Sequence, residues 1–190
     1  QVCLTAHLGS IDEDGQAVKT RDVKISEDFF NDYLKRFNTD YADVAFLHNC
    51  DTQDDYNTVM GPEGLLDLGL KLKEKGKVHF IGFSGHSVLT SVQAVESGSI
   101  DVLMFPVNMA SNAVPGKRDL FKACVDNNVG LVAMKTFAGG KLLTDEKKVT
   151  LTSYRTGAEP AKIEKTIPIT PLQCLSYTLS QVGVSTAVPG

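Results

Sequence analysis

Short apolar runs, separated by polar and helix-forming segments, recur along the whole chain. The runs are near-continuous rather than alternating, which is typical of parallel strands covered on both faces. Six strands are predicted, at Val2–Ala6, Asp43–Leu47, Val78–Phe83, Val102–Phe105, Gly130–Met134 and Ser185–Val188. Since parallel strands need crossover connections, the helical segments between them indicate an alternating β/α fold.

Start signals mark several of the predicted helices. Ser26 is expected to cap a helix, and Pro62 is expected at the first position of another that Gly76 ends. Three later helices are predicted to begin at Ser87, at about Lys117 and at Thr170-Pro171. Two polar stretches interrupt the alternation of predicted strands and helices, Gly9–Lys24 and Lys141–Pro168. We expect both to be long loops over the carboxyl ends of the strands.

Six strands are fewer than the eight of a closed (β/α)8 barrel, which typically takes about 250 residues. The expected fold class is therefore α/β, a (β/α)8 TIM barrel without its first two β/α units in these 190 residues. Gln1 leads directly into a strand and Gly190 directly follows one. We expect a segment of a longer protein, with residues 1–190 forming a single, partial barrel domain.

Composition narrows the function classes. The net charge of −4 argues against nucleic acid as a partner, because phosphate binding needs a basic face. No apolar run reaches the ~18 residues of a membrane span, so no membrane partner is expected. The 4 cysteines are widely spaced without a C-x-x-C pair, which favours buried thiols of a cytoplasmic protein over a zinc or iron–sulfur site.

Polar residues follow the predicted strands at their carboxyl ends, where β/α folds bind ligands. They are His7, His48, Ser84-Gly85-His86, Asn108 and Lys135. The imidazole of His48 could donate a hydrogen bond to a substrate carbonyl or act as a general acid, or it could simply cap the strand end. Three imidazoles, from His7, His48 and His86, could instead converge on a metal ion as in a hydrolase, although no local ligand spacing supports that alternative.

A glycine-containing loop follows the fifth strand, from Met134 to Lys141. Gly139 and Gly140 would let backbone amides approach a pyrophosphate, and Lys135 or Lys141 could neutralise its charge. The loop contains neither a Walker motif nor G-x-G-x-x-G, so an ordinary turn remains the alternative.

Taken in order, these segments resemble the aldo/keto reductase superfamily. The matching segments are Asp40–His48 (D-Y-x-D-x-x-x-x-H), Lys75–Ser84 (K-G-K-V-H-F-I-G-F-S), Val132–Lys135 followed by Gly139-Gly140, and Gly183–Gly190. Thr170–Ser180 and the Met134-Lys135 pair are similar to a branch that often carries a ferredoxin-like iron–sulfur tail, which would lie beyond Gly190. The resemblance covers the third to eighth strands of the barrel.

The resemblance implies an oxidoreductase that transfers hydride between NADP(H), or alternatively NAD(H), and a small-molecule carbonyl or alcohol. In the family a tyrosine protonates the carbonyl oxygen, a lysine lowers the pKa of that tyrosine, an aspartate supports the lysine, and a histidine orients the substrate. His48 matches the histidine, and His7 stands where the family has the lysine. These two are the expected catalytic residues. The tyrosine and aspartate positions would precede Gln1.

The resemblance also implies cofactor-binding residues. Ser84 matches the serine that holds the nicotinamide carboxamide, whereas Gly85 and Met104 replace an asparagine and a glutamine. Met134 stands where many members stack an aromatic ring, and the residues matching the pyrophosphate-binding stretch are Lys135, Thr136, Phe137, Gly139 and Gly140. No metal site is expected. The replacements at His7, Gly85 and Met104 keep open a second hypothesis, a barrel of this family that binds a nucleotide or small molecule without ordinary catalysis.

Overall fold

The computed structural model describes residues 2–145, 148–151, 161–164 and 168–189. Its main element is a six-stranded parallel sheet in the order β1-β4-β5-β6-β7-β10. The strands are β1 (Thr5–Leu8), β4 (Ala42–Leu47), β5 (Val78–Ser84), β6 (Val102–Pro106), β7 (Gly130–Met134) and β10 (Val184–Val188). Strands consecutive in this series are neighbours in the sheet, as in consecutive β/α units of a (β/α)8 barrel. Among the described residues β1 and β10 are the two sheet edges.

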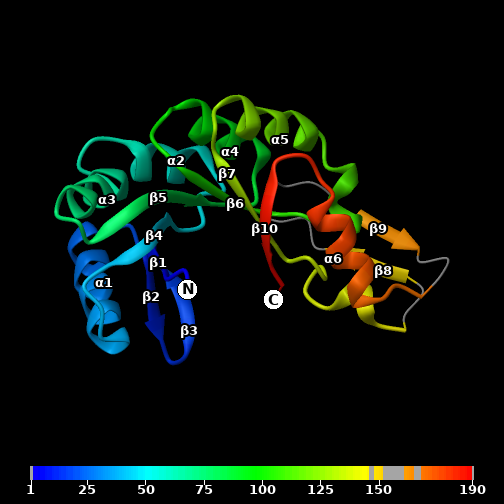
Figure 1. Ribbon diagram of the computed structural model, residues 1–190, viewed down its shortest axis with the longest axis horizontal. Helices are drawn as coiled ribbons and strands as arrows, with labels where there is room; N and C mark the ends of the chain where they lie inside the picture. Colours follow the sequence, from blue (N-terminus) through cyan, green and yellow to red (C-terminus); the bar gives the residue numbers. More distant parts are fainter. Residues whose placement is uncertain (1, 146–147, 152–160, 165–167, 190) are drawn as a thin grey trace.

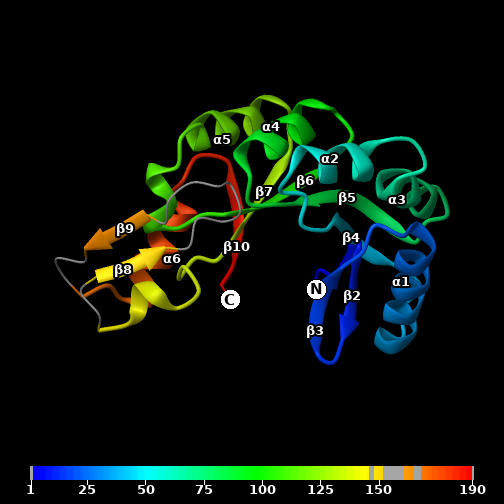
Figure 2. The same ribbon diagram turned by 180° about the vertical axis from the view of Figure 1, so that it is seen from behind.

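The sheet curves into an arch, and helices cover most of its convex side (Figures 1 and 2). The helices are α1 (Val23–Phe37), α2 (Gln53–Met60), α3 (Leu65–Glu74), α4 (Val88–Glu96), α5 (Lys117–Asp126) and α6 (Pro171–Leu179), with short 3-10 turns η1 (Met109–Ala113) and η2 (Lys141–Leu143). Strand residues that face these helices, such as Leu47, Ile81 and Leu131, are fully buried. The main hydrophobic core therefore lies between the sheet and its helices.

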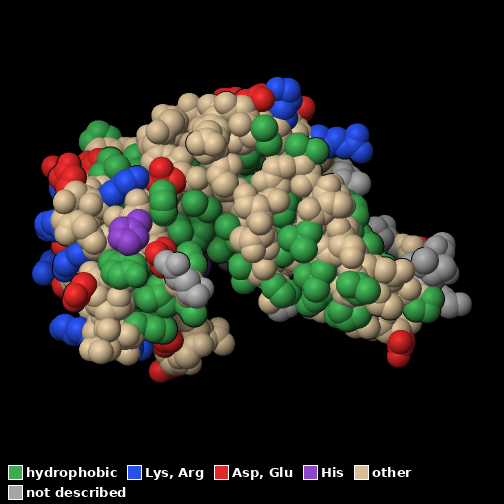
Figure 3. All heavy atoms as spheres, in the orientation of Figure 1, with side chains coloured by type: hydrophobic (Ala, Val, Ile, Leu, Met, Phe, Trp, Pro, Cys, Tyr) green, Lys and Arg blue, Asp and Glu red, His purple; other side chains and the backbone are tan. Residues whose placement is uncertain are grey.

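The opposite, concave face of the sheet is less completely covered. Val44 and Phe46 of β4 are buried there, whereas Phe80 of β5 and Val188 of β10 are about half exposed. Hydrophobic side chains gather in the hollow of the arch in Figure 3. A methyl group on Gly82 would lie 2.3 Å from the Phe46 ring, so the packing of these two strands requires glycine at this position.

The first strand lies further along the chain than the sequence suggested. It was expected at Val2–Ala6, but β1 pairs with β4 from Thr5, opposite Val44, to Leu8, opposite Leu47. Leu8 is fully buried in this register, which explains the shift. His7 consequently lies within the strand rather than after it.

Two expected helix starts are wrong. Helix α1 begins at Val23, where the Asp22 carboxylate accepts a hydrogen bond from the Ile25 amide. Ser26 lies inside that helix and is buried. Helix α3 begins at Leu65 after Gly64, so Pro62 lies in the preceding turn. The starts at Ser87 and Thr170-Pro171 are confirmed, and Thr170 forms a capping box with Gln173.

The expected loop at Gly9–Lys24 is a hairpin followed by the start of α1. The hairpin pairs β2 (Ser10–Glu13) with β3 (Gln16–Lys19). In the expected loop Lys141–Pro168 the described residues form η2 and a second hairpin of β8 (Lys148–Leu151) and β9 (Ala161–Glu164). Residues 146–147, 152–160 and 165–167 of that loop lie outside the described residues.

Candidate functional site at the carboxyl ends of the strands

His7 and His48 lie side by side at the carboxyl ends of β1 and β4. Their ring centroids are 5.0 Å apart and the ring planes differ by 29°, so the two imidazoles stack. His7 also packs edge-on against Phe46, at 5.9 Å. The His48 amide continues the β1–β4 pairing by donating to the Leu8 carbonyl at 2.9 Å. The parallel pairing of β1 with β4 thus brings these two residues together.

Burial makes both imidazoles weakly basic. The pKa of His48 falls from 6.5 to about 4, chiefly through desolvation and then through the positive potential of His7, Arg21 and His86, which Asp51 partly offsets. Desolvation also lowers the pKa of His7. Both rings are therefore neutral at pH 7, and each can donate one N–H hydrogen bond. His48 Nδ1 is buried and has no hydrogen-bond partner among the described residues.

Arg21, which the sequence reading did not single out, fixes the loop after β4. Its guanidinium donates to the carbonyl oxygens of His48 at 2.9 Å and Asn49 at 3.0 Å. It also pairs with the Asp55 carboxylate at 3.0 Å, and Lys19 of the hairpin binds that same carboxylate at 2.7 Å. These bonds hold the pKa of Asp55 below its ordinary value despite its burial. The hairpin is thereby tied to the loop that carries His48.

A chain of three side chains crosses from β4 to β7 at the same end of the sheet. Asp51 is buried, and its carboxylate accepts from the His86 backbone amide at 2.6 Å and lies 2.9 Å from His86 Nδ1. On the other side of the ring, His86 Nε2 lies 2.9 Å from Lys135 Nζ. The carboxylate, imidazole and amine thus form a continuous hydrogen-bonded chain. We call Asp51, His86 and Lys135 the relay.

The backbone of Lys135 is held as firmly as its side chain. Lys135 has a left-handed conformation, with φ of 56°. The amide of buried Asn108, which follows β6, donates to the Lys135 carbonyl at 2.9 Å, and the Ala138 amide donates to the same carbonyl at 2.8 Å. A turn that costs conformational energy is therefore stabilised from two sides.

Open space adjoins the turn after Lys135. Gly139 and Gly140 have φ of 66° and 81°, and no atom of the described residues lies within 4 Å of where their side chains would stand. Thr136 is fully buried and its hydroxyl has no partner among the described residues, while Phe137 packs against the small core of Ala110, Ala138, Leu142 and Cys174. A ligand could therefore come close to the glycine backbone, whereas the buried Thr136 side chain is less accessible to it.

Ser84, Gly85 and Met104 lie together at the carboxyl ends of β5 and β6. Ser84 is buried and pairs with Met104, whose carbonyl accepts from the Gly85 amide at 3.3 Å. A methyl group on Gly85 would lie 3.2 Å from the Cys50 carbonyl oxygen and 3.4 Å from Asp51 Oδ1. A side chain at this position would therefore crowd the loop after β4. Met104 and Met134 are partly buried strand residues at the same end.

The described residues give the three-histidine hypothesis no geometric support. His7 and His48 stack rather than point their nitrogens at one centre, and His86 is engaged by Asp51 and Lys135. No group of three or more His, Cys, Asp or Glu side chains in the described ranges could hold a metal ion.

The described tyrosines belong to helices or stand just before a strand. Tyr33 and Tyr177 belong to α1 and α6, Tyr41 precedes β4, and Tyr56 of α2 packs towards Phe83 on the helix-covered face. Tyr154 lies outside the described residues.

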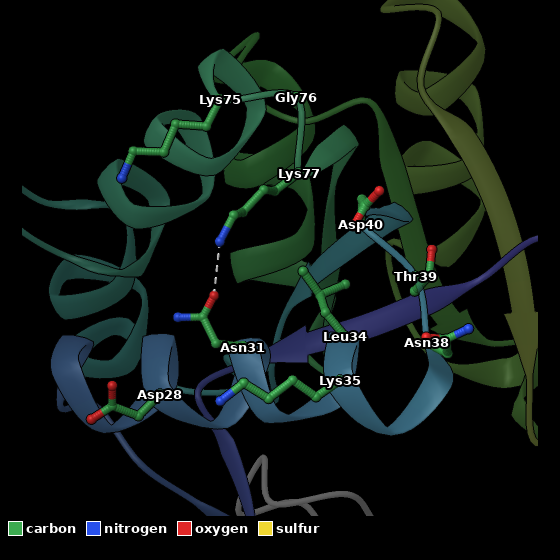
Figure 4. Close-up of a pocket in the computed structure, with 10 residues that line it drawn as sticks. All are labelled: Asp28, Asn31, Leu34, Lys35, Asn38, Thr39, Asp40, Lys75, Gly76 and Lys77. Atoms are coloured by element: carbon green, nitrogen blue, oxygen red, sulfur yellow. Dashed lines mark hydrogen bonds between the residues drawn. The ribbon is translucent and has the colours of Figure 1, made fainter.

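A hollow of about 1230 Å³ lies at the other end of the sheet (Figure 4). It is bordered by α1 and by the turn between α3 and β5, where Lys77 Nζ donates to Asn31 Oδ1 at 3.0 Å. This hollow faces the amino ends of the strands, away from His48 and the relay. It is not the site at which the strand-end residues converge.

The sequence named most residues of this end of the sheet but missed two connections. Asp51 follows His48 by three residues, so the rule that strand carboxyl ends carry the site would have included it. Arg21 left no such signal, since it stands before α1 and reaches His48 only through the fold. No helix in the described part of the chain is long and apolar enough to cross a membrane.

Comparison with known proteins places these features in a family. One similar structure is that of PA4992, the putative aldo-keto reductase from Pseudomonas aeruginosa. The match covers 98% of this chain and 60% of PA4992, at 18% identity and a TM-score of 0.67. A second is the holo form of the aldo-keto reductase AKR11C1 from Bacillus halodurans. The match covers 100% of this chain and 62% of AKR11C1, at 19% identity and a TM-score of 0.70. The chain thus spans about three fifths of each of these structures, and the likeness shows the shared barrel fold. The comparison with curated proteins gave no match. The model of the aldo/keto reductase family matches residues 13–190, and the chain belongs to that family.

Proposed function

We propose that this chain is part of an NAD(P)H-dependent oxidoreductase that transfers hydride between the nicotinamide and a small carbonyl or alcohol substrate. The chain belongs to the aldo/keto reductase family, and one observation carries the proposal. The carboxyl-terminal ends of three strands of one sheet bring together His48, Ser84 and Lys135. Active sites of (β/α)8 barrels lie at that end.

The residues at this end fit a dinucleotide in the pyrophosphate-binding part. The backbone at Gly139 and Gly140 is open to close approach, and the Lys135 amine lies beside it in sequence, held by His86. Ser84 is the candidate for the carboxamide, with Met104 and Met134 beside the ring position. The fit is poorer at Gly85, because a side chain such as the family's asparagine would crowd Cys50 and Asp51 there. We propose that the protein binds NADP in preference to NAD, and this preference rests on family membership alone.

The bound cofactor would supply the hydride. His48, neutral at pH 7, would orient the substrate by donating one hydrogen bond to its carbonyl oxygen, because a pKa of about 4 leaves too little imidazolium to serve as the acid. His7, where the family has a lysine, would keep the His48 ring in place by stacking on it.

The test is NADPH titration of the purified protein, followed by NADPH consumption with a panel of aliphatic and aromatic aldehydes. Binding that weakens at least several-fold in Ser84→Ala, with turnover lost in His48→Ala, would support the proposal. Ser99→Ala is the matched control, since Ser99 lies before β6 at the opposite end of the sheet and should leave binding unchanged. A protein that neither binds NADPH nor consumes it would overturn the proposal.

The second candidate is a nucleotide-binding barrel without reductase turnover. The neutral His7 favours it, because a neutral imidazole at the lysine position lacks the positive charge that would lower a neighbouring tyrosine's pKa. NADPH binding at the same Ser84-dependent site without turnover of any aldehyde would select this candidate. We also propose that the protein is cytoplasmic and that its partner is a small molecule rather than nucleic acid or a membrane. Localisation of the tagged protein in cells tests the cytoplasmic location.

A further inference from the structure

Lys117 begins α5 and is buried, with only 3% of its surface exposed. Its amine donates to the carbonyl oxygen of Ser111 at 3.3 Å and to the hydroxyl of the same residue. The amine also lies 5.6 Å from the centre of the Phe121 ring. The ion pairs found among the described residues do not include Lys117. A lysine in such surroundings is rare, because a buried charge is normally paired with an opposite charge.

The position of Lys117 is unfavourable for the fold alone. A positive charge is disfavoured at the amino end of a helix, and burial of the amine lowers the pKa of Lys117 to about 8. Both oxygen atoms of Ser111 have other partners, since the carbonyl accepts from the Val114 amide at 3.2 Å and the hydroxyl bonds to the backbone of Asn108. Ser111 is thus satisfied without the amine, and the stability of the fold does not explain the burial of Lys117.

Ser111 connects Lys117 to the end of β6. Ser111 and Asn108 form a capping box, in which the Ser111 amide donates to Asn108 Oδ1 at 2.8 Å and the Asn108 amide donates to Ser111 Oγ at 3.2 Å. Because a backbone amide can only donate, Oδ1 of Asn108 faces Ser111, and Nδ2 is left to donate to the Lys135 carbonyl at 2.9 Å. We call Lys117, Ser111 and Asn108 the brace.

We propose that Lys117 is a positioning residue for the turn after β7, residues 135–138, and that it acts through Ser111 and Asn108. The turn needs support because Lys135 and Ala138 both have a left-handed backbone, with φ of 56° and 52°, which residues other than glycine rarely adopt. The brace acts on the backbone carbonyl of Lys135 and requires nothing of its side chain. The consequence for the cofactor rests on the proposed function.

The brace is tested first without any ligand, in the folded full-length chain. The Ala138 amide reports on the turn, because it donates to the Lys135 carbonyl at 2.8 Å. Lys117→Met keeps a long side chain but removes its donors, and should speed hydrogen exchange of the Ala138 amide about three- to tenfold. The His48 amide, which donates to Leu8 on the β1 side of the sheet, should exchange as in the wild type. Unchanged exchange at Ala138 would overturn the inference.

Global stability separates positioning from a general structural role. Because methionine carries no charge to desolvate, Lys117→Met should unfold at the same urea concentration as the wild type or at a higher one. A lower urea midpoint, with faster exchange at both Ala138 and His48, would show a structural role alone and contradict the inference. Lys122→Met is the matched control, since Lys122 lies on the same helix but its amine is exposed and pairs with Asp126. It should change neither the midpoint nor the exchange at Ala138.

A double-mutant cycle tests whether Lys117 acts through Asn108. Asn108→Ser keeps a side chain that can cap the Ser111 amide but is too short to reach the Lys135 carbonyl. Alone it should speed exchange of the Ala138 amide about tenfold. Adding Lys117→Met to Asn108→Ser should speed the exchange by less than about a further twofold. Effects of the two substitutions that multiply would mean that Lys117 does not act through Asn108, and would contradict the inference.

NADPH binding then tests the consequence for the cofactor. Lys117→Met should raise the NADPH dissociation constant about three- to tenfold and leave kcat at saturating NADPH within about twofold, because the turn would contact the cofactor and not the reacting carbonyl. Faster exchange at Ala138 with an unchanged dissociation constant would overturn the link to cofactor binding.

The outcomes separate this inference from the proposed function. No NADPH binding in any form, with faster Ala138 exchange in Lys117→Met, would overturn the reductase and keep the brace. Wild-type Ala138 exchange in Lys117→Met, in a protein that binds and consumes NADPH, would overturn the brace and keep the reductase.

Discussion

At the scale of single residues, the carboxyl end of the sheet keeps two histidines neutral and joins a third to a lysine and a buried carboxylate. His7 and His48 lose basicity because they are buried beside each other and near Arg21. Lys135 Nζ instead lies 2.9 Å from His86 Nε2, and the other ring nitrogen of His86 faces the buried Asp51. The neutral pair and this hydrogen-bonded chain therefore both lie at the carboxyl end of the sheet.

The neutral state of His48 makes folding stability depend on pH. Its folded pKa of about 4 lies below the ordinary 6.5, so the stabilisation present above pH 6.5 is lost as the pH falls towards 4, because the unfolded chain binds the proton first. Allowing for partial exposure of the ring, this contribution is about 2 kcal/mol. Urea unfolding at neutral pH and near pH 4.5 should show a smaller acid destabilisation in His48→Asn than in the wild type. His79→Gln, at an exposed ring, should behave as wild type, and an unchanged pH dependence in His48→Asn would contradict the assignment.

The hydrogen bonds of Arg21, which we call the Arg21 clamp, predict that lysine cannot replace arginine at this position. The guanidinium bonds to two backbone carbonyls and one carboxylate at once. A lysine side chain is shorter, and its ammonium group would keep only one of these bonds. Arg21→Lys should lower the free energy of unfolding by about 1–2 kcal/mol and speed amide hydrogen exchange in residues 48–52. Arg36→Lys is the control, since Arg36 makes an exposed pair with Asp32 worth a few tenths of a kcal/mol. Equal, small losses in both variants would show that the clamp does not stabilise the loop.

At the scale of elements, the sequence predicted the parallel strands and most helices, because apolar runs and caps are local signals. It misplaced β1 by about three residues, since the register depends on pairing with β4 rather than on the apolar run itself. It missed the β2–β3 hairpin and α2, whose segments are polar and short. The site followed the same rule: residues directly after strands were found, whereas Arg21 and the Asp51–His86–Lys135 connections depend on contacts distant in sequence.

Ser26 shows how a local signal can serve a distant contact. The residue looked like a helix cap, but its hydroxyl accepts a hydrogen bond from the buried Gly9 amide at 2.8 Å, joining α1 to the end of β1. Ser26→Ala should therefore cost about 2 kcal/mol of unfolding free energy, because it leaves a buried N–H unpaired even though alanine favours helices. Ser180→Ala, at the exposed end of α6, should change stability by less than about 0.5 kcal/mol. A neutral or stabilising Ser26→Ala would refute the role of this bond.

At the scale of the whole molecule, the described sheet has two edges and an unevenly covered concave face. The helices cover most of the convex side, but Phe80 and Val188 on the concave side remain about half exposed. Unpaired edge strands beside exposed apolar side chains favour pairing with other chains. The single-domain organisation expected for residues 1–190 predicts one cooperative unfolding transition, which calorimetry can check on a monodisperse sample.

The open sheet leads to the last prediction, self-association of a polypeptide with these 190 residues. Its mass by light scattering coupled to size exclusion should exceed the 20.5 kDa of one chain and rise with concentration. Thr186→Lys should reduce the association, because a charge on the β10 edge opposes edge-to-edge pairing. Leu89→Lys, on the exposed side of α4, adds the same charge away from the edges and should leave the mass unchanged. If Leu89→Lys disperses the assembly as well as Thr186→Lys does, net charge rather than the β10 edge controls it. A wild-type chain that stays monomeric at every concentration would mean that the edges and the concave face are closed in solution by contacts within the chain itself.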